Sequence, residues 1–166
     1  LGVDGGGRAA GDDPDIVGAR AITFMAAHGL RNGPEPAPIG AAMIGGIVAN
    51  NASGMCCGTA QNSYKTIADI RMILHDGTVL DTADAESVAS FYETQAYLIE
   101  EIKDLRHTII ANPALEERIR QKFKIKNTTG YSINAFVDYD DPIEIIKHLM
   151  VGSEGTLAFI SNVTFK

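Results

Sequence analysis

The chain has 166 residues, of which 45% are hydrophobic and 21% are charged, an ordinary composition for one globular domain with a buried core. Its formal net charge of -7 has no compensating basic cluster, which argues against nucleic acid and anionic membranes as main partners. No apolar run reaches the roughly 18 residues that a transmembrane helix needs, and the N-terminus lacks a signal-peptide pattern. The only cysteines, Cys56 and Cys57, are adjacent and favour a reducing, cytoplasmic setting.

The first third of the chain predicts one helix followed by an extended loop. The glycine-rich start, Leu1 to Gly11, is expected to be loose or a strand. Asp13-Pro14 predicts a helix start, with Asp13 as the N-cap and Pro14 in the first helical position. An apolar face then recurs at helical spacing, at Val17, Ala21, Ile22 and Met25, and Gly29 stands where a C-terminal cap is expected. Three prolines between residues 32 and 38 predict an extended loop.

The remainder predicts a hairpin and three helices. Asp76-Gly77 between the β-type runs 67–74 and 78–80 is typical of a hairpin. Asp84 precedes a long helical pattern from residue 88 to residue 109, and Asn112-Pro113 ends it and begins a second helix. Residues 124–137 are mixed and turn-rich, Asp141-Pro142 begins a third helix, and residues 156–165 read as a closing strand. Together these elements predict an α+β fold.

The segment from Met43 to Thr59 carries the clearest functional pattern. Four glycines, two small hydroxyl residues and an Asn-Asn pair interrupt an apolar run, which is typical of a backbone that lies close to a flat, apolar ligand. Gly45-Gly46 could open a helical turn whose free N–H groups face a phosphate or a flavin carbonyl. The polar residues Asn50, Asn51 and Ser53 could bond the edges of a ring, and Gly54 and Gly58 could lie against its face. A close-packed structural segment remains the alternative.

Two later segments could contribute to the same site. The turn Gly152-Ser-Glu-Gly155 can present successive N–H groups to an anion, or it can be an ordinary hairpin turn. The turn from Lys126 to Tyr131 could contact a ribityl chain or ring. The four histidines, His28, His75, His107 and His148, lack ligand spacing, so we expect no metal site. The sequence shows no convincing catalytic acid or base, and the vicinal cysteines are interpreted as packing residues.

In their order along the chain, these segments resemble the FAD-linked oxidase family, whose FAD-binding fold is of the vanillyl-alcohol oxidase / p-cresol methylhydroxylase (PCMH) type. The resemblance rests on Gly33-Pro-Glu-Pro36 followed by Ile44-Gly-Gly to Ala-Ser-Gly54, and on Gly152-Ser-Glu-Gly-Thr-Leu157. The segment from Lys126 to Tyr131 matches a further family stretch between them. Within the family, the chain is most similar to FAD-dependent D-lactate and glycolate dehydrogenases, some of which are fused to an iron–sulfur region.

This resemblance implies FAD as the cofactor and an α+β second FAD-binding subdomain, with a mixed or antiparallel sheet flanked by helices. Residues 1–166 are then a single, partial FAD-binding domain, and the first FAD subdomain, the substrate cap and any iron–sulfur region would lie elsewhere in the full-length enzyme. Met43 stands where the family commonly has Thr. The implied cofactor-binding residues are Ile44, Gly45, Gly46, Asn50, Asn51, Ser53, Gly54, Gly58, Tyr64, Gly155, Thr156 and Ile160.

The implied activity is oxidation of a small D-2-hydroxy acid, of the lactate or glycolate type, by hydride transfer to FAD. In such enzymes the missing cap would supply the base and the carboxylate-binding groups, so no catalytic residue is assigned in this chain. Two alternatives stay open: a flavoenzyme of the same fold that acts on another alcohol or a sugar, and a non-catalytic module that binds a partner. We expect a cytoplasmic protein, with a peripheral position at the inner membrane open for the full-length enzyme.

Overall fold

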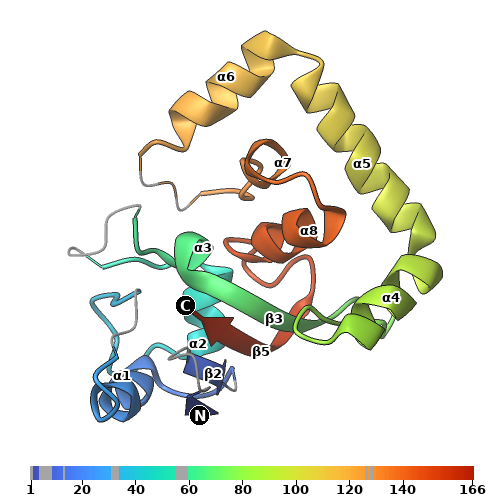
Figure 1. The fold of residues 1–166 in the computed structure, drawn as a ribbon. Helices are drawn as coiled ribbons and strands as arrows, with labels where there is room; N and C mark the ends of the chain where they lie inside the picture. Colours follow the sequence, from blue (N-terminus) through green and yellow to red (C-terminus); the bar gives the residue numbers. More distant parts are fainter. Residues whose placement is uncertain are drawn as a thin grey trace.

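The computed structural model describes residues 2–3, 9–12, 14–30, 34–54, 60–125, 127 and 129–166. Several residues singled out in the sequence lie outside this described part: Asp13, Gly33, Cys56, Cys57, Gly58 and Lys126. The described residues form one antiparallel sheet and a set of helices that pack on it (Figure 1). The fold is therefore α+β, as the sequence predicts.

The sheet has the strand order β1-β2-β5-β3-β4, and all neighbouring strands are antiparallel. Its strands are β1 (Gly2–Val3), β2 (Ala9–Asp12), β3 (Ile67–Ile73), β4 (Val79–Asp81) and β5 (Phe159–Phe165). The predicted hairpin is confirmed as β3 and β4, with Gly77 at φ +87° in its turn. The last strand, β5, lies at the centre of the sheet between β2 and β3, so it joins the N-terminal strands to the β3–β4 hairpin.

Eight helices occur in the described residues. They are α1 (Gly18–Ala26), α2 (Ile44–Ala49), α3 (Ser63–Thr66), α4 (Ala85–Thr94), α5 (Ala96–Ile110), α6 (Pro113–Lys122), α7 (Ala135–Asp138) and α8 (Pro142–Met150). In Figure 1, α5 and α6 form an outer arm around α7 and α8. None of the helices in the described ranges is long and apolar enough to span a membrane.

Local capping chemistry fixes three helix starts and one helix end where the sequence predicts them. The side chains of Asp84, Asn112 and Asp141 accept hydrogen bonds from backbone N–H groups in the first turns of α4, α6 and α8. After α1, the N–H groups of Gly29 and Leu30 donate to the carbonyls of Ala26 and Met25, with Gly29 at φ +71°. This pattern is a Schellman motif, so the predicted glycine cap is confirmed.

Two predicted helix boundaries are wrong, and both errors have a long-range cause. The first helix begins at Gly18, because the residues before it turn and bond to the start of α2: the N–H of Ile44 donates to the carbonyl of Ile16, and that of Gly45 donates to the carbonyl of Pro14. The long pattern after Asp84 breaks at Gln95, whose φ of -116° and ψ of 31° separate α4 from α5. The Gln95 amide is held there by Asp76 and Thr78 of the hairpin turn.

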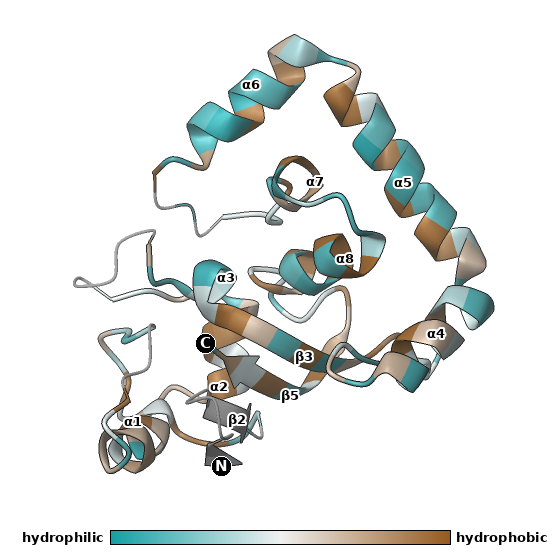
Figure 2. Cartoon of the chain, viewed as in Figure 1, coloured by the Kyte–Doolittle hydropathy of each residue, from teal (hydrophilic) through white to brown (hydrophobic). Residues whose placement is uncertain are grey.

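The hydrophobic core lies between the sheet and α2, α4, α5 and α8. In Figure 2, β3 and α8 carry hydrophobic segments, whereas α6 is mostly hydrophilic. The buried side chain of Lys147 ties α8 to the sheet, because its Nζ donates to the backbone oxygen of Ala68 at 2.7 Å and to Glu144 at 2.7 Å. A buried ammonium needs such partners to offset its lost hydration. Packing in this core therefore fixes the positions of β3, β5 and α8 relative to α2.

Candidate functional site

The two glycine-rich segments that are about a hundred residues apart meet in the fold. The turn that follows α8 packs against the C-terminal end of α2: the N–H of Gly152 donates to Val48 O at 3.1 Å, and that of Glu154 donates to Ala49 O at 2.9 Å. The last carbonyls of a helix have no partner within the helix. The turn supplies a donor to two of them, and Val48 O also accepts from the Asn51 N–H at 2.9 Å. The Asn50 amide completes the junction with a 2.7 Å bond to the Glu154 carboxylate.

The two adjacent glycines at the start of α2 have different surroundings. A Cβ at Gly45 would lie 2.9 Å from Cβ of Pro14 and 3.2 Å from its carbonyl oxygen, so this glycine allows two segments of the chain to pack closely. A Cβ at Gly46 would have no described heavy atom within 4 Å. Gly46 therefore leaves a bare stretch of backbone on the outer face of α2.

This bare face lies between two hollows. One, of about 500 Å³, is lined by Gly46, Ala49, Glu154, Gly155 and Ile160, among others. The other, of about 460 Å³, is lined by Gly46, Ile47, Asn50, Ala52 and Ser53, with the prolines of the preceding loop. Met43 and Gly46 line both, so we treat the two hollows together and call them the α2 groove.

The α2 groove exposes large apolar side chains and is also lined by a serine whose hydroxyl has no hydrogen-bond partner in the described part of the chain. Met43 is 51% exposed and Phe159 is 63% exposed, although both are large hydrophobic residues. The Ser53 Oγ, by contrast, is buried and has no hydrogen-bond partner among the described residues. Exposed apolar surface beside a few convergent polar groups is typical of a ligand site. The α2 groove has this character.

The structure brings together only part of the predicted site. Six of the predicted cofactor-binding residues line the α2 groove: Gly45, Gly46, Asn50, Ser53, Gly155 and Ile160. The Ile44 side chain is fully buried in the core, so it has no face toward the groove. The N–H of Gly45 is not free, because it donates to Pro14. Thr156 is exposed and bonds Tyr131 and Ser153, and Gly58 lies outside the described residues.

Asn51 and Tyr64 line a separate cavity, whose other walls come mainly from α6 and α7. Asn51 adopts φ 47°, in the left-handed region, and its Oδ1 accepts a hydrogen bond from the Tyr64 N–H at 3.3 Å. The Tyr64 hydroxyl donates to Asp138 at 2.9 Å. Burial and the Asp138 carboxylate raise the pKa of Tyr64 far above its usual value, so this hydroxyl stays protonated and serves as a donor.

Two residues that line the α2 groove were not predicted from the sequence as site residues. Pro14 and Phe159 both line it, and neither was expected there. For Phe159 a signal exists: it lies in an unbroken apolar run between Leu157 and Ile160, whereas a half-buried strand normally alternates apolar and polar residues. In the part of the chain that the structure describes, no group of three or more His, Cys, Asp or Glu side chains could hold a metal ion.

Comparisons with known proteins agree with the motif resemblance. Residues 13–83 match the model of a family described as FAD binding domain. The D-2-hydroxyglutarate dehydrogenase of Haemophilus influenzae is 28% identical to this chain over 141 residues. That match covers 82% of this chain but 14% of the relative, so the chain spans about one seventh of the length of this curated relative. The matched family segment includes Pro14 and all of α2, which line the groove.

Proposed function

We propose that the α2 groove is the part of the flavin-binding site that this chain contributes. The premise is that the chain carries an FAD-binding domain of the FAD-linked oxidase family, related to D-lactate dehydrogenase-type enzymes. The cofactor of this domain is FAD. The described residues fit it: the Gly46 backbone is open, the Ser53 hydroxyl lacks a partner, and apolar side chains stand exposed beside them. The bare face of Gly46 between the two hollows is the observation that carries this assignment.

Each part of the groove would have a distinct task. The open backbone at Gly46 would let a large planar group approach the helix, and Met43 and Phe159 would cover its apolar surface. Asn50 is already bonded to Glu154, so it would act by holding the turn at Gly155 against α2. The Ser53 Oγ, which no described residue bonds, would hydrogen-bond a polar edge of the cofactor.

We further propose that residues 1–166 act as the second FAD subdomain of a PCMH-type fold, with the facing subdomain and substrate cap supplied by other parts of the complete protein. The relative whose name states an activity on D-2-hydroxyglutarate and the family motifs point to one substrate class, a D-2-hydroxy acid. Bound FAD supplies the chemistry, by accepting a hydride from the substrate. This chain would orient the flavin and exclude water from one side of it.

The test is flavin reduction in the purified complete protein under anaerobic conditions. D-lactate, glycolate and D-2-hydroxyglutarate are added separately, and loss of the oxidised flavin absorbance is recorded, with L-lactate and L-2-hydroxyglutarate as controls. We expect bleaching by at least one D-acid or glycolate and none by the L-acids. Bound flavin that none of these acids reduces would refute the substrate class. Protein that binds no flavin would refute the groove assignment itself.

A further inference from the structure

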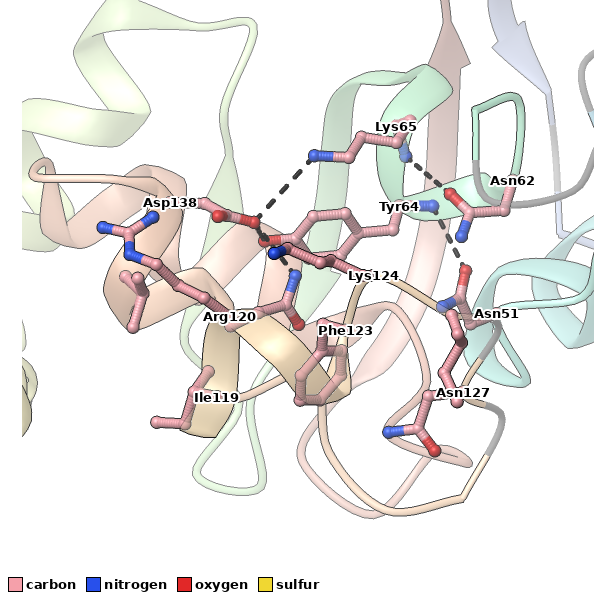
Figure 3. Close-up of a pocket in the computed structure, with 13 residues that line it drawn as sticks. Asn51, Asn62, Tyr64, Lys65, Ile119, Arg120, Phe123, Lys124, Asn127 and Asp138 are labelled. Atoms are coloured by element: carbon pink, nitrogen blue, oxygen red, sulfur yellow. Dashed lines mark hydrogen bonds and ion pairs between the residues drawn. The ribbon is translucent and has the colours of Figure 1, made fainter. Parts of the chain in front are cut away.

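A second cavity, separate from the α2 groove, lies between α3, α6 and α7 (Figure 3). It has a volume of about 270 Å³ and shares no lining residue with the two hollows of the groove. This volume lies just below the usual range of about 300–1,000 Å³ for sites that bind drug-sized molecules. The cavity is therefore suited to a small metabolite.

The charges that line this cavity are mostly positive, although the whole chain is acidic. Its ionisable walls comprise the cations Lys65, Arg120 and Lys124, and the carboxylate of Asp138. Arg120 is paired with Glu116 at 2.7 Å. Lys124 bonds only the neutral amide of Gln121, at 3.0 Å, and no carboxylate among the described residues lies within ion-pair distance of it.

The Asp138 carboxylate offsets only one of these positive charges, that of Lys65, with which it forms an ion pair. Its Oδ2 accepts hydrogen bonds from the Tyr64 hydroxyl at 2.9 Å and from the Asn134 amide at 3.0 Å. Lys65 Nζ is a further 3.9 Å from the same oxygen. An incoming anion would therefore meet Lys124 with its charge unpaired.

A second, independent observation points to a hydrogen-bond donor on the ligand. Asn134 lines the cavity and is 8% exposed, and its Oδ1 is buried without a partner among the described residues. Its amide nitrogen is already committed to Asp138. An unpaired buried acceptor is costly, and a hydroxyl group in the cavity would satisfy it.

We propose that this cavity binds a small hydroxycarboxylate, with the carboxylate at Lys124 and the hydroxyl at the Asn134 Oδ1. The apolar walls formed by Ile119, Phe123 and Val137 suit the short carbon chain between the two groups. Tyr64, which keeps its proton, adds no negative charge to the site. The proposal does not depend on the function of the α2 groove, because the two sites have no lining residue in common.

The test is isothermal titration of the purified complete protein, in flavin-loaded and flavin-free forms, with malate and with succinate. The two acids have the same chain length and carboxylates and differ by one hydroxyl group. We expect malate to bind both forms and to bind more tightly than succinate. Lys124→Gln should weaken malate binding about two- to fivefold, the usual effect of losing one ion pair at an exposed lysine.

Lys122→Gln is the matched control, because Lys122 is an exposed lysine at the end of α6, two residues before Lys124, and does not line the cavity. Malate affinity should be unchanged in this variant. Equal affinity for malate and succinate, an equal loss in both lysine variants, or malate affinity that is unchanged in Lys124→Gln would each overturn the proposal. Absence of malate binding would do the same. Flavin absorbance, recorded on every sample, reports the state of the α2 groove separately.

Discussion

The side-chain amide of Asn50 donates a 2.7 Å hydrogen bond to the carboxylate of Glu154, and so joins the end of α2 to a turn 104 residues further along the chain. Glu154 itself adopts φ 54°, a conformation that is costly for a residue with a side chain. The bond to Asn50 and the backbone bond to Ala49 hold it there. The position of the Gly155 side of the groove therefore depends on this pair together with the backbone bonds between the turn and α2.

Asn50→Ala should loosen the turn and lower flavin affinity. The bond is exposed, so we expect the free energy of unfolding to fall by about 1 kcal/mol or less, whereas flavin retention should fall more clearly. Denaturant unfolding and flavin absorbance after gel filtration measure the two effects. Glu154→Gln keeps an acceptor for Asn50 and is the control. If Asn50→Ala retains flavin as well as Glu154→Gln does, the pair has no role in the groove.

The two glycines of α2 should respond differently to the same change. Gly46→Val places its side chain in open space, so the fold should be retained, with a change in unfolding free energy of about 1 kcal/mol or less, while flavin occupancy falls. Gly45→Val brings a side chain against Pro14 and should destabilise the fold itself by about 1–3 kcal/mol. Circular dichroism and bound flavin are measured for both. Unchanged flavin occupancy in Gly46→Val would count against the cofactor assignment.

The Tyr64 hydroxyl should contribute measurably to stability. Tyr64 is buried and bonds Asp138 at 2.9 Å, so Tyr64→Phe should lower the free energy of unfolding by about 1–3 kcal/mol, as expected for a bond to a charged group. Tyr92→Phe is the matched control, because the Tyr92 hydroxyl makes a similar bond to Asp141 at an exposed position. There the loss should be about 0.5 kcal/mol or less. An equal loss of unfolding free energy in both variants would contradict the idea that burial strengthens the contribution of the Tyr64 hydrogen bond.

His148 should make stability depend on pH. Burial lowers the pKa of His148 from 6.5 to about 4 in the folded protein, while the ring is stacked on Tyr139 with 4.0 Å between centroids. Between these two pH values the unfolded chain binds a proton that the folded chain does not. The free energy of unfolding should therefore fall as the pH drops from about 6.5 to about 4, by about 3 kcal/mol in total from this residue.

Urea unfolding at a series of pH values measures this slope. His148→Gln should flatten the slope between pH 6.5 and 4, because the titrating group is gone. His28→Gln, at an exposed histidine of the turn after α1, is the control for the replacement of a histidine by glutamine. A slope that is the same in the wild-type protein and in His148→Gln would show that other groups carry the acid sensitivity.

Features set by neighbouring residues could be predicted from the sequence alone. The caps at Asp84, Asn112 and Asp141 act on N–H groups two or three residues away, and Gly77 shapes a turn within the β3–β4 hairpin. Such interactions need nothing from the rest of the chain. The ordered glycine-rich motifs likewise pointed to the FAD-binding family, because their pattern is a property of the sequence itself.

Only the tertiary structure decided which residues share a site. The sequence could not distinguish Gly45 from Gly46, since the difference is the presence of Pro14 against one of them and open space beside the other. It placed Asn51 and Tyr64 with the cofactor residues, whereas the fold turns them toward a different cavity. It predicted one helix across Gln95, where the side chain is captured by the hairpin turn. In each case the deciding contact joins segments that are distant in sequence, and local patterns carry no information about such contacts.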